Sequence, residues 1–138
     1  MTPKNPAQRR YLRRMSIATV VYVASLLGAK YLIEHALVSG PLVWPLAVVP
    51  GLAAAGILYA VGMLIVEQAD EFQRMLLVRQ VLVATGFAIS LATVWGFLEM
   101  FLLVPHVEAF WILGLWCFGL FIGGVSNRIT HGAWGQCW

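Results

Sequence analysis

Residues 78–104 read VRQVLVATGFAISLATVWGFLEMFLLV, and Arg79 and Glu99 are the charged residues among them. A helix needs about 20 mostly apolar residues to cross a bilayer, so this run is long enough to be a transmembrane span. Residues 16–33, 42–66 and 109–125 form three further apolar runs that meet or approach the same requirement. The connections between the runs are short, which favours antiparallel neighbours. The sequence therefore predicts an all-α integral membrane fold, an up-down bundle of four transmembrane helices.

The composition supports one membrane domain over residues 1–138. Hydrophobic residues make up 61% of the chain, charged residues 11%, and the mean hydropathy is +0.83. A soluble domain carries about a quarter charged residues, so water is a poor solvent for this surface. Four spans leave room for short turns and a basic amino-terminal tail, residues 1–15, and no room for a second, soluble domain.

The basic residues predict the orientation of the spans. Short loops rich in Lys and Arg stay in the cytoplasm. If the four spans alternate, eight of the nine basic residues fall on one side. They are Lys4, Arg9, Arg10, Arg13, Arg14, Arg74, Arg79 and Arg128. The two turns on the other side carry none. We therefore expect both termini to be cytoplasmic.

Lys30 and Glu99 are ionisable residues within the predicted spans, each about one turn before the outer end. A lone charge at that depth is unfavourable, and an ion pair between the two would relieve both. The simpler interpretation is a structural intramembrane ion pair. The alternative makes Glu99 a proton-coupled or cation-binding group in an outward-facing polar pocket.

The segment Asp70-Glu71-Phe72-Gln73-Arg74 precedes the third span. Asp70 followed by Gln73 three residues later is a capping-box spacing, and acidic residues in a first turn suit the helix dipole. We therefore expect the third helix to begin near Glu71, before the membrane, and to expose Phe72, Met75, Leu76 and Arg79. The segment serves either as a helix cap alone or as a docking surface for a cytoplasmic partner. Phe72 favours docking, because a cap does not require an aromatic residue.

Small residues recur at a spacing of four in several spans. Examples are Ala24 with Gly28, Gly51 with Ala55, Gly56 with Ala60, and Gly119 with Gly123. Small side chains let helix backbones approach closely in lipid. The pattern predicts either a tight bundle or self-association.

Recognisable catalytic and cofactor motifs are missing from the sequence. It contains no phosphate-binding glycine loop, no set of His and Cys residues at metal spacing, and no nucleophile with an adjacent base. We expect no enzyme activity, no cofactor, no metal and no nucleic-acid partner. The expected partners are membrane lipids and either another protein or further copies of the chain.

Three features together carry a resemblance: the basic start Arg9-Arg10-Tyr11-Leu12-Arg13-Arg14, a second span centred on Pro50, and Asp70-Glu71-Phe72-Gln73-Arg74 leading to Gly96-Phe97-Leu98-Glu99. The chain resembles a group of small, uncharacterised four-span inner-membrane proteins of proteobacteria. The resemblance implies the four-span topology and a bacterial inner membrane, and it implies no activity.

The function expected from these observations is that of a non-enzymatic small integral membrane protein. It would be an accessory subunit or membrane anchor that binds a larger complex or a cytoplasmic partner. The alternative is a small oligomeric transporter or channel that uses Lys30 and Glu99.

Overall fold

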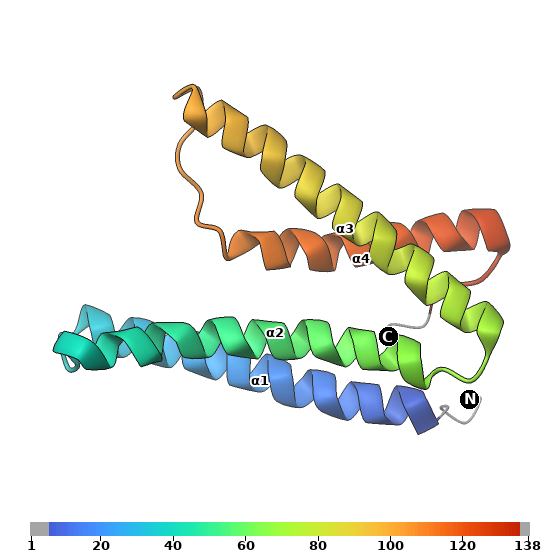
Figure 1. Cartoon of the computed structure of the whole chain (residues 1–138), viewed down its shortest axis with the longest axis horizontal. Coiled ribbons are helices and arrows are strands. Elements are labelled where there is room, and N and C mark those ends of the chain that lie inside the picture. The colour runs from blue at the N-terminus through green and yellow to red at the C-terminus, as the bar shows by residue number, and fades with distance from the viewer. Residues whose placement is uncertain (1–5, 136–138) are drawn as a thin grey trace. The chain divides into compact units, whose positions relative to one another are not determined.

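The computed structural model describes residues 6–135. That part of the chain is all-helical and contains no strand. In chain order the elements are α1 (Pro6–Glu34), the short 3-10 helix η1 (Gly40–Leu42), α2 (Val43–Glu67), α3 (Glu71–Met100) and α4 (Trp111–His131), as Figure 1 shows. The four α-helices are long and apolar enough to cross a membrane. The predicted all-α class with four membrane-length helices is therefore confirmed.

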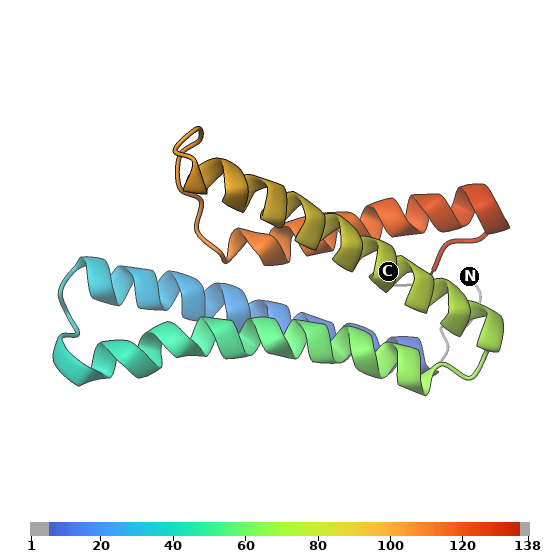
Figure 2. The same ribbon diagram turned by 45° about the horizontal axis from the view of Figure 1, so that its top comes forward.

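The helices form two compact units, each of them a helical hairpin. Unit 1 contains α1, η1 and α2, and unit 2 contains α3 and α4. Figures 1 and 2 show α1 and α2 side by side and antiparallel within unit 1. The same views show α3 and α4 crossing within unit 2 and separating toward the loop that joins them. That all four helices form one bundle stays a prediction.

The helices and the predicted spans differ at their ends. α1 begins at Pro6, within the segment predicted as a basic tail, because proline is tolerated in a first turn and arginine and glutamine are good helix formers. α3 begins at Glu71 and ends at Met100, before the expected end of the third span at Val104. Leu102 has a left-handed φ of 58°, which stops the helix.

The core of unit 1 is formed by one face of α2. Its buried residues recur at intervals of three or four, as expected for a single helix face, and they are Ala53, Ile57, Ala60, Val61 and Leu64. A methyl group added at Gly56 would lie 3.6 Å from the Cβ of Ala18, an ordinary contact. Added methyl groups at Gly28 and Gly51 would meet no atom within 4 Å. Small residues at these positions therefore do not create close backbone contacts.

The core of unit 2 is a much closer contact between two backbones. A methyl group at Gly119 would lie 2.7 Å from the Cα of Ala84, and one at Gly123 would lie 2.7 Å from the carbonyl oxygen of Gln80. Neither glycine therefore tolerates a side chain at this separation. The predicted pair Gly119 and Gly123 is used for packing α4 against α3 within the chain.

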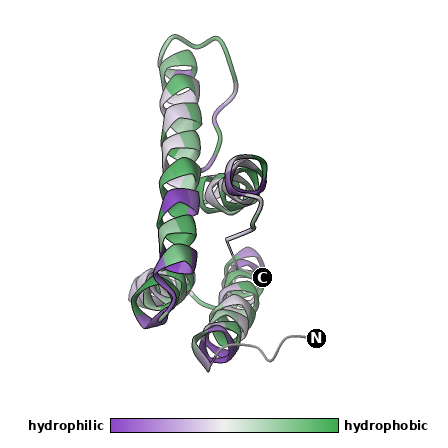
Figure 3. Cartoon of the chain, turned by 90° about the vertical axis from the view of Figure 1, so that its right-hand side faces the viewer, coloured by the Kyte–Doolittle hydropathy of each residue, from purple (hydrophilic) through white to green (hydrophobic). Residues whose placement is uncertain are grey.

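Figure 3 shows α3 from the side, with hydrophobic residues along most of its length and hydrophilic residues in its amino-terminal part. This distribution is the one expected of helices that span lipid and keep their polar ends in water.

Candidate functional site

The first turn of α3 is fixed by Asp70. Its Oδ1 atom accepts hydrogen bonds from the backbone N–H groups of Phe72 at 2.9 Å and Gln73 at 3.4 Å. Asp70 is thus the N-cap of the helix, and its carboxylate satisfies donors that have no partner within the helix. The amide oxygen of Gln73 is buried without a hydrogen-bond partner. The reciprocal half of a capping box is therefore not formed in the described structure.

Phe72 and Met75 lie on the surface at this end of α3, each with 47% of its area exposed. Leu76, which was expected to be exposed with them, is completely buried. That expectation is wrong because Leu76 lies one turn before Gln80 on the face that packs against α4. The described surface of the segment is therefore Phe72 and Met75 with their charged neighbours.

His131, the last residue of α4, contacts two of these α3 residues. Arg79 Nη1 lies 2.6 Å from His131 Nε2, so the guanidinium donates to a ring nitrogen that carries no proton. The rings of Phe72 and His131 meet edge to face, with centroids 6.4 Å apart. The amino end of α3 and the carboxyl end of α4 are thus held together by side chains at the surface of unit 2.

Two buried amides join α3 and α4 just inside this end. Gln80 Nε2 donates to the carbonyl oxygen of Leu120 at 2.8 Å, and Asn127 Nδ2 donates to that of Leu76 at 2.8 Å. Both side chains are completely buried. Each helix therefore sends one amide to the backbone of the other. Such bonds between membrane helices contribute about 0.6 kcal/mol on average and up to about 1.7 kcal/mol.

Sequence reasoning missed Gln80 and Asn127, although a signal for them was present. Each is an uncharged polar residue next to a long apolar run, one near the start of the third predicted span and the other just after the fourth. An antiparallel pair places two such positions at the same depth. Polar residues that share a depth on neighbouring membrane helices are candidates for interhelical hydrogen bonds.

The segment after α4 turns back over this amide pair. Gly132 ends the helix in a left-handed conformation, with φ 67°, and its N–H donates to the carbonyl of Arg128. The Arg128 guanidinium lies 5.3 Å from the centre of the Trp134 ring, within cation–π range. A methyl group at Gly135 would overlap Gln80 Oε1. The backbone at Gly135 therefore lies directly against the buried amide of Gln80.

A groove runs along α3 on the side away from α4, with a volume of about 400 Å³. We call it the α3 groove; it is lined by Glu71, Arg74, Met75, Val78, Arg79 and Leu82. These positions are spaced along one side of the helix, while Leu76, Gln80 and Ala84 face α4. Among the described residues, unit 2 therefore leaves this side of α3 uncovered, apart from the contact of Arg79 with His131.

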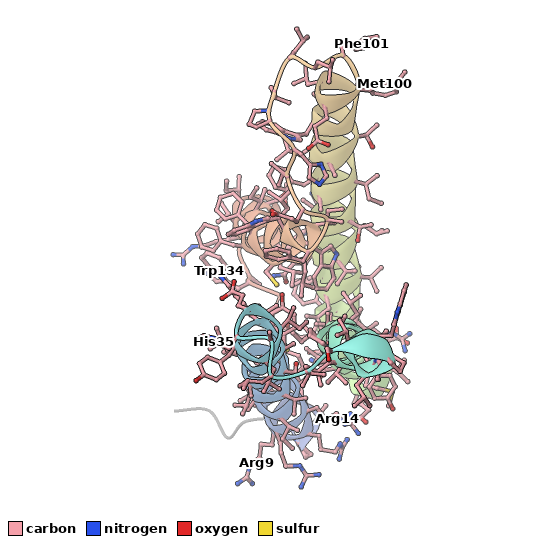
Figure 4. The ribbon with its side chains drawn as sticks, turned by 90° about the vertical axis from the view of Figure 1, so that its left-hand side faces the viewer. Arg9, Arg14, His35, Met100, Phe101 and Trp134 are labelled. Atoms are coloured by element: carbon pink, nitrogen blue, oxygen red, sulfur yellow. The ribbon has the colours of Figure 1, made fainter. Side chains whose placement is uncertain are left out.

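In unit 1, the amino end of α1 is tied to the carboxyl end of α2. Arg10 Nε and Arg14 Nη1 each lie 2.7 Å from a different oxygen of Glu67. Glu67 follows the predicted span 42–66, and the hydrogen bonds from Arg10 and Arg14 lower its pKa below the usual carboxyl value. Figure 4 shows Arg9 and Arg14 projecting from this end of α1. Two arginines of the predicted basic tail therefore have a structural role.

Lys30 and Glu99 each have a partner near them in sequence. Lys30 Nζ lies 3.8 Å from Glu34 Oε1 on the surface of α1. Glu99 Oε1 accepts a 2.8 Å bond from the N–H of Val107, and Oε2 lies 3.3 Å from His106 Nδ1. Glu99 thereby orders the loop after α3. Lys30 belongs to unit 1 and Glu99 to unit 2, and the ion pair between them stays a prediction.

Among residues 6–135, no group of three or more His, Cys, Asp or Glu side chains is arranged to hold a metal ion. Cys117 is a free thiol, and Cys137 lies outside the described residues. No protein-family model, no curated protein and no solved structure matches the chain.

Proposed function

We propose that this chain is a non-enzymatic multi-pass protein of the bacterial inner membrane, acting as an accessory subunit or membrane anchor for a protein partner. Four helices of membrane length support the multi-pass part of the proposal. The basic residues, gathered on one side of the spans, support cytoplasmic termini. The α2–α3 connection, with the start of α3, then also lies in the cytoplasm.

The observation that carries the proposal is the ordered surface at the start of α3. Asp70 caps the helix, so Phe72 and Arg74 project from a defined turn rather than from a loose loop. Phe72 is about half exposed although it lies beside His131. Aromatic residues and arginine contribute strongly to binding when a partner buries them. This surface lies before the predicted third span, where a soluble domain or the extramembrane part of a complex can reach it.

The polar groups between α3 and α4 support a structural rather than a catalytic interior. Gln80 and Asn127 bond to backbone carbonyls, and Trp116 Nε1 donates to Thr85 Oγ1 at 3.0 Å. Each of these contacts joins two helices. A rigid hairpin of this kind suits a protein whose role is to present a surface.

The alternative function, transport through Lys30 and Glu99, has less support. Both oxygens of Glu99 are engaged by the loop residues His106 and Val107, which favours a role in ordering that loop. The alternative requires that protein reconstituted in liposomes move an ion or small cation, and that Glu99→Gln stop the movement.

The test of the proposed function is purification of the tagged chain from native membranes in mild detergent. We expect a stoichiometric protein partner that Phe72→Ala weakens and Phe72→Ala with Arg74→Glu removes. Phe101→Ala is the matched control, because Phe101 is also exposed and projects from the opposite end of unit 2 (Figure 4). A partner retained equally by all variants, or lost equally with Phe101→Ala, would contradict the assignment of this surface.

A further inference from the structure

The α3 groove changes from charged to apolar along the helix axis. Glu71 and Arg74 lie at its beginning, Arg79 lies beside Val78, and Leu82 lies at its far end. At 1.5 Å per residue, Arg74 and Leu82 are about 12 Å apart along the helix. The predicted third span begins at Val78, so this length crosses the boundary between the headgroup layer and the hydrocarbon.

We propose that the α3 groove binds an anionic phospholipid, whose phosphate lies at Arg74 and Arg79 and whose acyl chain lies along Met75, Val78 and Leu82. This inference goes beyond the proposed partner-binding function and does not depend on it.

The charges of the groove favour an anion. Among the described residues, Arg74 and Arg79 form no ion pair with a carboxylate, whereas Arg10 and Arg14 share Glu67. His131 accepts one hydrogen bond from Arg79, which fixes the guanidinium and leaves its other N–H groups for a phosphate. Glu71 is the acidic residue of the groove and lies at the end farthest from Leu82. The phosphate is therefore expected deeper than Glu71.

The apolar residues of the groove favour a lipid chain beneath that phosphate. Met75, Val78 and Leu82 are 47%, 40% and 67% exposed, and they lie on the side of α3 that α4 does not cover. Lys and Arg side chains near the cytoplasmic surface of a membrane attract anionic lipid, each by about 1 kcal/mol. A protein helix would also cover the apolar residues. It would not account for two arginines at headgroup depth without a carboxylate partner.

The experiment is native mass spectrometry of the full-length protein in detergent. Phosphatidylglycerol and phosphatidylcholine with identical acyl chains are added in a concentration series. We expect preferential retention of one phosphatidylglycerol. We expect Arg74→Gln with Arg79→Gln to weaken its apparent affinity about 10- to 30-fold. Arg74→Gln alone should weaken it by a smaller factor, and because Arg74 forms no ion pair with any of residues 6–135, we expect its loss not to disturb the fold.

The matched control is Arg9→Gln with Arg13→Gln. It removes the same charge from two exposed residues at the amino end of α1 and should leave retention unchanged. An equal loss in this control would mean diffuse attraction of anionic lipid and would overturn the site. Equal retention of both lipids by the unmodified protein would overturn it as well.

Two further arms separate other occupants from a lipid. Excess inorganic phosphate should not displace phosphatidylglycerol, and displacement would mean that the groove recognises a free anion. Val78→Ala with Leu82→Ala should weaken lipid retention while leaving the co-purified protein partner in place. If that variant loses the partner and keeps the lipid, the groove binds a protein helix and the lipid proposal is wrong.

Phe72→Ala distinguishes this inference from the proposed function. Phe72 does not line the groove, so Phe72→Ala should weaken retention of the protein partner without changing lipid retention. If no protein partner is found, the lipid site can still be tested. If the lipid is not retained preferentially, the proposed partner site is unaffected.

Discussion

The glycines of this chain differ in function, and the difference depends on what lies opposite each one. Gly123 faces the carbonyl oxygen and Cα of Gln80, 2.7 and 2.9 Å from where a Cβ would lie, and both belong to a helix backbone that moves only as a whole. Gly86 lies in the same hairpin and faces no atom within 4 Å. Spacing in the sequence marks Gly119 and Gly123 as a packing pair, but the same spacing also marks Gly28 and Gly51, which make no such contact.

This contrast predicts the effect of adding one methyl group. We expect Gly123→Ala to destabilise unit 2 by about 1–3 kcal/mol, because the two helices must separate to admit it. Gly86→Ala should be neutral or stabilising by up to about 1 kcal/mol, through its better helix propensity. Unfolding of the protein by sodium dodecyl sulfate in mixed micelles, followed by circular dichroism, measures both. Equal effects of the two substitutions would show that α4 does not approach α3 as closely as described.

At the scale of the helical element, α1 and α2 of unit 1 are joined by three side chains that meet beyond the predicted spans. Arg10 and Arg14 converge on Glu67, whose pKa is lowered by the hydrogen bonds that they donate. A carboxyl group with a lowered pKa in the folded state stabilises that state above its unfolded pKa, and the contribution is lost as pH falls through the folded pKa.

We expect Glu67→Gln to increase hydrogen exchange at the amino end of α1 at neutral pH. At a pH below the folded pKa of Glu67, the variant and the unmodified protein should exchange alike. Lys30→Met, which removes an exposed pair at the other end of the helix, is the control and should change exchange little. A difference that persists in acid would mean that Glu67 acts through something other than its charge.

The elements also show which features the sequence could predict. Four long apolar runs predict four helices, because a chain that crosses a bilayer can form few other structures there. Asp70 before Phe72 indicates where α3 begins, because an N-cap is a local interaction. The buried state of Leu76 depends on which face of α3 meets α4, and so do the partners of Gln80. The contact with α4 determines which face of α3 is buried. The sequence of an almost uniformly apolar helix has little hydrophobic periodicity to show which face that is.

At the scale of the whole molecule, the polar contacts of each unit gather at the end that the charge pattern predicts to be cytoplasmic. In unit 1 these contacts are the ion pairs of Arg10 and Arg14 with Glu67. In unit 2 it is Arg79 with His131, and the amides of Gln80 and Asn127 just beyond. At the other ends, Lys30 and Glu34 are exposed, and Glu99 orders a loop rather than joining two helices. The proposed partner site and the α3 groove therefore lie at the end of unit 2 where these polar side-chain contacts join α3 to α4.

This arrangement has functional meaning only if that end is cytoplasmic, which single-cysteine labelling tests directly. In a background with Cys117→Ser and Cys137→Ser, we expect Ser39→Cys to react with a membrane-impermeant maleimide in intact spheroplasts. Ala69→Cys should react only after the membrane is opened, although both positions are exposed at the surface of the protein. The physical reason is the absence of Lys and Arg from the connection that contains Ser39, compared with Arg74 and Arg79 soon after Ala69. Reaction of Ala69→Cys in intact spheroplasts would place Phe72 and Arg74 outside the cell. Neither a cytoplasmic partner nor an inner-leaflet phospholipid could then occupy the sites proposed for them.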